Sequence, residues 1–299
     1  MSKLSKFAGY AWFVLVFNLG VIIWGAYVRA SGSGAGCGSH WPLCNGLVIP
    51  QKPEIATLIE YSHRLSSGLA FIFVLWMFIW SLRSYPKHHL VRQGSLYSLV
   101  FICTEALVGA GLVLFEWVAQ DASVGRVISI SVHLINTFLL LAALSLTAWW
   151  ASGNILSFNN IRGTHFWLYL LGLIGLILIG ISGAITALGD TLFPVQSLIE
   201  GVQQDFSKTA HFIIRLRIWH PLIAFLTSIY IILMTLLSST GNENKSKKYI
   251  MVTLCSFIIM QLIAGLINVF LLAPIWLQLI HLLLADIIWI LTILFITTE

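Results

Sequence analysis

Charged residues are scarce in this sequence. Asp, Glu, Lys and Arg make up 9% of its 299 residues, against about 25% in an average soluble domain. No soluble fold of this size covers its surface with so few charges. The composition therefore excludes a cytosolic enzyme, a secreted disulfide scaffold and a disordered chain.

Long basic tracts are missing as well. The net charge is +5, yet the longest basic stretch is Lys245-Ser246-Lys247-Lys248. A nucleic-acid-binding face needs a larger cluster of Lys and Arg to neutralise phosphates. We therefore attribute the basic excess to membrane topology and expect no nucleic-acid partner.

Apolar residues, in contrast, are abundant, at 59% of the chain. This is enough for roughly eight membrane spans of about 20 residues each. The sequence therefore predicts an all-α, polytopic membrane protein with eight transmembrane helices. By hydropathy these cover about residues 7–28, 60–82, 94–118, 127–150, 164–187, 212–238, 249–272 and 274–297.

The basic residues predict how these spans are oriented. An even number of spans places both termini on one side, together with nine of the 16 basic residues. Short loops rich in Lys and Arg face the cytoplasm. We therefore expect a cell-membrane protein with both termini in the cytoplasm and the longer connections, 29–59 and 188–211, outside. The nine residues are Lys3, Lys6, Arg83, Lys87, Arg92, Arg162, Lys245, Lys247 and Lys248.

Two of the 4 cysteines, Cys37 and Cys44, lie in the first outer connection. On an oxidising face such a pair forms a disulfide or acts as an exposed redox dithiol. Half of a metal site with His40 is the alternative, although zinc sites normally take four ligands. Cys103 and Cys255 fall inside spans, where we expect them to pack as small apolar side chains.

The two halves of the sequence repeat each other sparsely, but at intervals that agree to within one residue. This spacing predicts two tandem four-helix bundles, residues 1–152 and 163–299. Because a four-span unit begins and ends on one side, the bundles should be related by a pseudo-two-fold axis along the membrane normal. The matching residues are Gly25 and Gly183, His63 and His220, Glu105 and Gln261, and Gly109 and Gly265.

Four histidines lie within or at the outer ends of the spans, on the second and fourth span of each half. Ionisable side chains inside a membrane are usually functional. Neutral imidazole ligates haem iron, and two histidines on neighbouring helices can hold one haem between them. One such residue alone would be interpreted as a core histidine, but the repeat favours two haem sites near the outer face. The four are His63, His133, His220 and His281.

Charged residues flank these histidines unequally. Arg64, Arg215 and Arg217 are candidates for binding haem propionates, with interfacial snorkelling as the alternative. Glu60 precedes His63 by three residues and shares its helical face, whereas Arg217 holds the matching position in the second half. An acid near one haem can stabilise a cation, accept a proton or attack carbon. A surface carboxylate at the helix start is the alternative.

These motifs resemble those of the haem A synthases, which mature haem for cytochrome oxidases. The resemblance covers nearly the whole chain, and it is specific because the cysteine loop, the Glu-x-x-His-Arg motif and the four histidines occur together. The matching stretches are Gly32–Cys37 with Trp41–Cys44, Glu60–Arg64, Glu105–Gly109 and, as in members without a second cysteine pair, Ala187–Pro194.

The resemblance implies oxidation of the C8 methyl group of haem O to a formyl group, with oxygen derived from water. Expected partners are haem O and haem A, haem O synthase and cytochrome oxidase assembly factors, and a homo-oligomer is left open. The implied site comprises substrate haem O on His63 and His133, a haem b cofactor on His220 and His281, an essential acid at Glu60 and a paired Cys37 and Cys44.

Two other classes of membrane protein fit part of this pattern. A di-haem cytochrome would carry electrons between quinol and an outer-face partner, but it would not need the asymmetry between Glu60 and Arg217. A repeat-built transporter would place its marked residues at mid-membrane. The sequence assigns no role to Glu105, Asp286 or His211.

Overall fold

The computed structural model describes residues 5–154, 164–239 and 244–298. Within these ranges all regular structure is helical, apart from one isolated bridge between Cys44 and Leu47. The helices are α1 (Lys6–Ala30), α2 (Ile55–Ser84), α3 (Leu90–Leu114), α4 (Val124–Ala151), α5 (Thr164–Leu192), α6 (Leu198–Phe206), α7 (Phe212–Arg217), α8 (Trp219–Leu237), α9 (Lys245–Phe270) and α10 (Ile275–Thr297).

The predicted eight spans are confirmed. Among the described residues, eight helical stretches are long and apolar enough to cross a membrane, the sixth of them formed by α7 and α8 together. Many of their large apolar side chains are exposed, among them Trp76, Leu107 and Phe225. Exposed apolar surface on this scale is the surface that lipid covers.

Several helix boundaries differ from the predicted ones by up to five residues, and three of the differences in helical structure have a local reason. The second span begins at Ile55, five residues early, because the uncharged turn 55–59 continues the helix beyond the acid Glu60. The sixth span breaks between α7 and α8, because Pro221 has no N–H to donate to the carbonyl of Arg217. The connection 188–211 contains the short helix α6, whose N-cap is Ser197.

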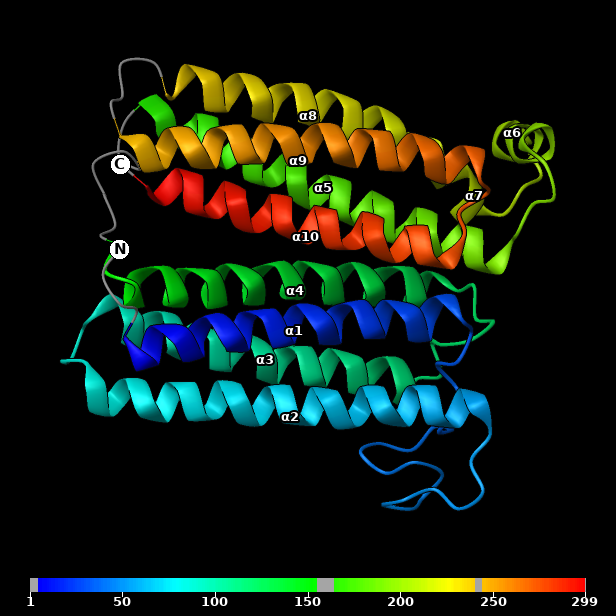
Figure 1. The fold of residues 1–299 in the computed structure, drawn as a ribbon. Coiled ribbons are helices and arrows are strands. Elements are labelled where there is room, and N and C mark those ends of the chain that lie inside the picture. Colours follow the sequence, from blue (N-terminus) through cyan, green and yellow to red (C-terminus); the bar gives the residue numbers. More distant parts are fainter. Residues whose placement is uncertain (1–4, 155–163, 240–243, 299) are drawn as a thin grey trace.

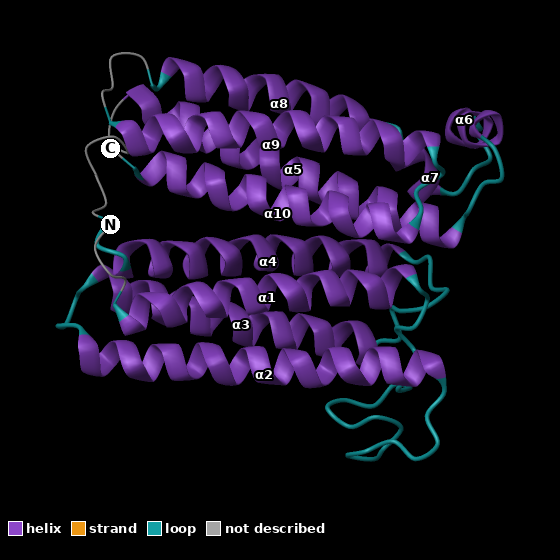
Figure 2. Cartoon of the chain, in the orientation of Figure 1, coloured by secondary structure: helices purple, strands orange, loops and turns teal. Residues whose placement is uncertain are grey.

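The spans lie side by side in two layers. Helices α1–α4 form one layer, and α5, α8, α9 and α10 form the other (Figures 1 and 2). Contacts of α4 with α5 and α10, and of α1 with α10, join the layers. The pseudo-two-fold axis and the division into 1–152 and 163–299 stay predictions.

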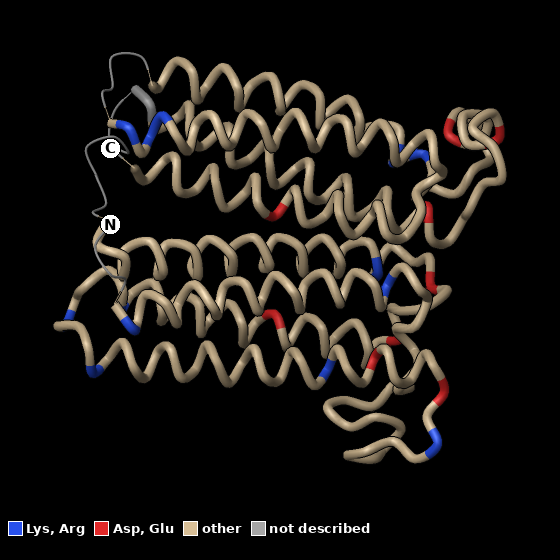
Figure 3. Tube along the Cα trace, in the orientation of Figure 1, with Lys and Arg blue, Asp and Glu red and all other residues tan. Residues whose placement is uncertain are grey.

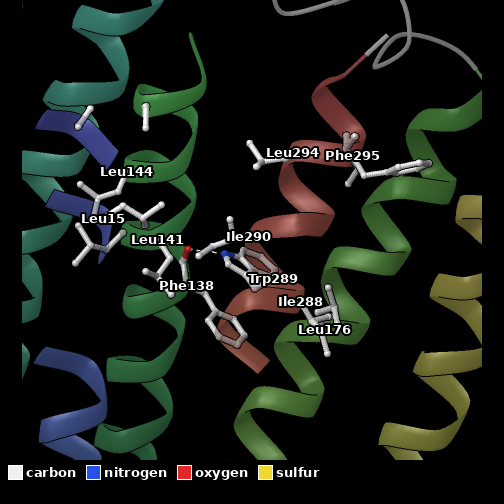
Figure 4. Close-up of a cluster of buried hydrophobic side chains, with 14 of the residues drawn as sticks. Leu15, Phe138, Leu141, Leu144, Leu176, Ile288, Trp289, Ile290, Leu294 and Phe295 are labelled. Carbon is white, nitrogen blue, oxygen red and sulfur yellow. Dashed lines mark hydrogen bonds between the residues drawn. The ribbon is translucent and has the colours of Figure 1, made fainter. Parts of the chain in front are cut away.

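Aromatic packing stabilises the contact between the layers. The rings of Phe138 on α4 and Trp289 on α10 stack with centroids 4.7 Å apart. The indole nitrogen of Trp289 also donates to the carbonyl oxygen of Phe138 at 2.6 Å (Figure 4). Leu141 and Ile288 belong to the same buried cluster. Because lipid is as apolar as this core, close packing and interhelical hydrogen bonds are what join the layers.

A second link between the layers lies near the end of the molecule where α1 ends and α10 begins. The guanidinium of Arg29, in the last turn of α1, donates to Ala187 and Thr191 of α5 at 2.7 and 2.9 Å, and to Gln278 of α10 at 3.2 Å. Arg29 and Ala187 hold matching positions, four residues after Gly25 and Gly183. The matching segments of the two halves therefore contact each other at this point.

Basic residues gather at the end of the molecule where α1 begins and α10 ends (Figure 3). Lys6 begins α1, Arg83 lies in the last turn of α2 and Lys245 begins α9. Lys3 and Arg162, two further members of the predicted cytoplasmic set, lie outside the described residues. The cytoplasmic orientation of this end stays a prediction.

We expect Trp289→Ala to lower the free energy of unfolding by about 3–5 kcal/mol, because it removes a large buried ring. Trp289→Phe should lower it by only about 1 kcal/mol, because the stacked ring stays and one hydrogen bond is lost. Thermal unfolding in detergent, followed by circular dichroism, measures both variants. Wild-type stability in Trp289→Ala would show that this contact does not hold the layers together.

Candidate functional site

Each of the four span histidines packs against a glycine on a neighbouring helix. A Cβ atom built on Gly25 would lie 2.8 Å from Cε1 of His63, and one built on Gly183 would lie 3.0 Å from Cε1 of His220. Separations below 3.0 Å are essentially never seen for real Cβ atoms, so the α1 and α5 glycines make room for the rings. Gly109 and Gly265 hold the corresponding places beside His133 and His281, at 3.9 and 3.1 Å.

The rings of His220 and His281 are close to each other across α8 and α10. Their centroids lie 6.4 Å apart, and their planes are 84° from parallel. Two imidazoles on opposite sides of one iron would have centroids roughly 6 Å apart, since each metal–nitrogen bond is about 2 Å long. His220 has one nitrogen occupied, with Nδ1 lying 3.0 Å from Oγ of Ser182. This pair therefore fits a haem held through both histidines.

The other pair, His63 and His133, belongs to α2 and α4. The Nδ1 atoms of both rings are buried without a hydrogen-bond partner. The nearest acid to His133 is Glu105 of α3, whose Oε1 lies 3.3 Å from Nδ1. Imidazoles with unsatisfied nitrogens in an apolar bundle are costly. The protein thus leaves these rings without hydrogen bonds at Nδ1, and a haem iron is a ligand that such imidazoles would bind.

Glu60 is buried, with 3% of its surface exposed, in the second turn of α2. Its Oε2 accepts a hydrogen bond from the backbone N–H of Cys37 at 2.8 Å. Its Oε1 pairs with the guanidinium of Arg64, one turn further along the helix. The surface-carboxylate alternative is therefore wrong, because the helix begins earlier than expected and the first outer loop covers this acid.

Cys37 and Cys44 form a disulfide, and both are almost fully buried. The metal site with His40 and the exposed dithiol are therefore wrong, since the sulfurs are bonded to each other beneath the loop. The guanidinium of Arg64 donates to the carbonyl oxygens of His40 and Leu43 at 2.5 and 2.6 Å. The disulfide loop and Arg64 together hold the Glu60 carboxylate in one position.

The three arginines proposed for propionates have different surroundings. Arg64 is occupied by Glu60 and the loop, as described above. Arg217 pairs with Asp190 at 2.8 Å and with Asp205 at 2.6 Å, and so ties the α6 region to α5 and α7. Arg215 is exposed, which leaves it open to a carboxylate ligand.

Other polar residues fall outside the predicted set. His211 caps α7, with Nδ1 accepting from the N–H of Ile213 at 3.4 Å, and its ring lies against Phe193. Asp286 is fully buried in α10, and neither carboxyl oxygen has a hydrogen-bond partner. Arg29 was not singled out from the sequence, although its position at the end of a repeated motif was the available signal.

Comparison with known proteins finds relatives that match most of this chain. A family model described as cytochrome oxidase assembly protein (COX15–CtaA) matches residues 8–293. A heme A synthase of Staphylococcus haemolyticus is 28% identical over 264 residues, covering 86% of this chain and 83% of that protein. A heme A synthase of an Exiguobacterium species is 34% identical over 142 residues, covering 48% of this chain and 46% of that protein. This chain belongs to the haem A synthase family.

Other relatives of this haem A synthase family member carry a different name. A protein of Thermus thermophilus called protoheme IX farnesyltransferase is 50% identical over 287 residues. The match covers 96% of this chain but 47% of that protein, so the chain spans about half the length of this relative. The same holds for the corresponding protein of a second Thermus thermophilus strain.

We expect the double variant Cys37→Ser, Cys44→Ser to lose about 2–3 kcal/mol of stability, the loop-entropy estimate for a short ring. It should also loosen Glu60, because the Cys37 N–H that binds its carboxylate belongs to the cross-linked loop. Thermal unfolding measures the first effect, and alkylation of protein from intact cells followed by mass spectrometry tests the bond itself. Cys103→Ser is the matched control, since that cysteine is free. Alkylation of both Cys37 and Cys44 in wild-type protein would contradict the disulfide.

Proposed function

We propose that this chain is a haem A synthase that oxidises the C8 methyl group of haem O to a formyl group, with oxygen derived from water. The proposal rests on the two histidine pairs. Each histidine packs against a glycine of a neighbouring helix, but the charged residue that precedes the first histidine differs between the two pairs. One pair has the buried acid Glu60 three residues before its first histidine, and the other has Arg217 there. Two sites with identical tasks would not need this difference.

The charge difference assigns the substrate to the first half. His63 and His133 would hold haem O, and His220 and His281 would hold haem b. When bound, haem b supplies a one-electron carrier whose potential is set by its axial ligands and burial. Arg215 is the available partner for a haem propionate, because Arg64 and Arg217 already bind carboxylates.

The reaction makes a specific demand on the first site. Each hydroxylation of the methyl carbon by water releases two electrons and two protons, which an external electron acceptor and the solvent would take up, and the second gives a hydrated aldehyde that loses water. Positive character develops on the methyl carbon as electrons leave. The carboxylate of Glu60, fixed by the Cys37 N–H and Arg64, would stabilise that charge in a site from which the loop excludes bulk water.

The farnesyltransferase named among the relatives supports a prenylated haem as the substrate. About half of that protein is 50% identical to this chain, and the other half belongs to the same polypeptide. An enzyme that transfers a farnesyl group to protohaem IX makes a prenylated haem, and haem O is such a haem. We propose such an enzyme as the partner that supplies the substrate, with cytochrome oxidase assembly factors receiving the product at the cell membrane.

A di-haem electron carrier is the second candidate, because the two histidine pairs are so alike. Haem extraction and chromatography from cells with and without this chain separate the two functions. Haem A that appears only when the chain is present supports the synthase. Unchanged haem composition, with two haem b molecules bound per chain, would favour the carrier.

We expect Glu60→Gln to bind haem O and retain haem b but to form haem A about 10²–10³-fold more slowly, since it keeps the shape and loses the charge. Chromatography of the extracted haems measures the product and any hydroxymethyl intermediate. Glu54→Gln, an exposed acid at the start of the same helix, is the control. Wild-type haem A yield from Glu60→Gln at equal protein level would remove Glu60 from the mechanism.

We expect one tightly held low-spin haem b in the purified protein, bound through His220 and His281. Alanine at either position should abolish its low-spin absorption spectrum while the ligands of the first half stay intact. His211→Ala is the matched control, because this histidine caps a helix nearby. A full low-spin spectrum in the double variant His220→Ala, His281→Ala would show that the two halves have been assigned wrongly.

A further inference from the structure

The last histidine of each half has a different polar neighbour, and the difference is one charge. In the first half Oε1 of Glu105 lies 3.3 Å from Nδ1 of His133. In the second half the amide nitrogen of Gln261 lies 3.3 Å from Nε2 of His281. Glu105 and Gln261 hold matching positions on α3 and α9, each four residues before the glycine that seats its histidine.

The Glu105 carboxylate is held by a network that α4 supplies. Oγ1 of Thr137 donates to its Oε1 at 2.5 Å, and the amide nitrogen of Asn136 donates to its Oε2 at 2.5 Å. Asn136 is itself oriented by Thr104, whose hydroxyl donates to the Asn136 amide oxygen at 2.6 Å. His133, Asn136 and Thr137 share one face of α4, because they are three and four residues apart.

The second half has no such network. Counted from His281, the positions that match Asn136 and Thr137 are Leu284 and Ala285, which have no side-chain donor. The amide oxygen of Gln261 is buried without a hydrogen-bond partner. The first half therefore contains a built carboxylate site beside its histidine, and the second half contains a neutral amide in the same place.

We propose that Glu105 is a positioning residue for His133: its carboxylate, 3.3 Å from Nδ1 and not hydrogen-bonded to it in this structure, accepts the Nδ1–H when the first-half haem is bound, leaves Nε2 for the iron and makes that imidazole the stronger donor of the two halves. The proposal rests on the proposed function for the location of that haem. Carboxylate partners of metal-ligating histidines fix the tautomer and raise the basicity of the ligand. A stronger axial donor favours ferric over ferrous iron, so the first-half haem should have the lower reduction potential.

A purely structural role for Glu105 is less consistent with the contacts. Carboxylates inside a membrane are expensive, and glutamine has the same length and could bond to the same Asn136 and Thr137 side chains. The matching helix uses glutamine at this position and still packs its histidine on a glycine. The carboxylate is therefore retained for its charge, which acts on His133.

The test uses the protein that already holds haem b, with ferric protoporphyrin IX as the probe of the first-half site. Glu105→Gln should bind the ferric probe about 10–100-fold more weakly, the usual effect of removing such a partner. In redox titration the probe's midpoint potential should rise. Glu105→Asp keeps the charge and should stay near wild type, and the potential of haem b should not change in either variant.

A wild-type affinity and potential for the probe in Glu105→Gln would overturn the proposal, as would equal effects of Glu105→Gln and Glu105→Asp. If Glu105→Gln lowers the haem b content, the fold has suffered, and Thr137→Val then carries the test. This variant keeps the charge but removes the Thr137 hydrogen bond that holds the carboxylate beside the ring, so the carboxylate should move away from Nδ1 and the potential should shift upward, and an unchanged potential would overturn the proposal. Haem A formation is measured in a separate assay. If that assay contradicts the proposed substrate oxidation, the binding and redox results for Glu105 can still be interpreted.

Discussion

The contact between an imidazole and a glycine on the next helix is the constraint on which the rest of this structure depends. It occurs four times, at matching positions of the repeat. A Cβ atom at Gly25, Gly183 or Gly265 would lie 2.8, 3.0 or 3.1 Å from the facing ring, so at these three places the missing side chain makes room for the histidine, whereas a Cβ at Gly109 would be in ordinary contact at 3.9 Å. The close approach explains why glycine and histidine keep their spacing while most of the repeat has diverged.

The two halves share this arrangement but differ in their polar groups, and three of the differences lie beside the histidines. The first half has Glu60 where the second has Arg217, and Glu105 where the second has Gln261. The partners reverse accordingly: Glu60 is bound by Arg64 and a peptide N–H, whereas Arg217 is bound by Asp190 and Asp205. The third difference is at the first histidines, where His220 contacts Ser182 and the Nδ1 of His63 has no partner. The acids Glu60 and Glu105 of the first site, replaced by Arg217 and Gln261 in the second, suit the proposed substrate oxidation in one and electron storage in the other.

Much of this was predictable from the sequence, because the relevant signals are local or periodic. Hydropathy predicted the eight spans, and repeated spacing matched the histidines and glycines of one half with those of the other, although it did not predict that each histidine packs against a glycine. The burial of Glu60 was not predictable, because it depends on the fold of the first outer loop over α2. The binding of Arg217 by Asp190 and Asp205 was missed for a similar reason, since both acids are distant in sequence from Arg217. The pairing of Arg64 with Glu60 was missed although the two are four residues apart on one helix, a spacing that indicates such a pair. Helix α6 was missed because nine residues with four polar side chains give a weak hydropathy signal.

The central claim is that each glycine makes room for a histidine that binds haem. It is tested most directly by the haem content of two matched variants, Gly25→Leu and Gly183→Leu, each of which fills the space beside one histidine ring. Gly183→Leu should lose the low-spin haem b while its first half still takes up ferric protoporphyrin IX. Gly25→Leu should keep haem b and lose that uptake. If both variants bind haem as the wild type does, the histidine pairs are not haem ligands, and the account of the two sites is wrong.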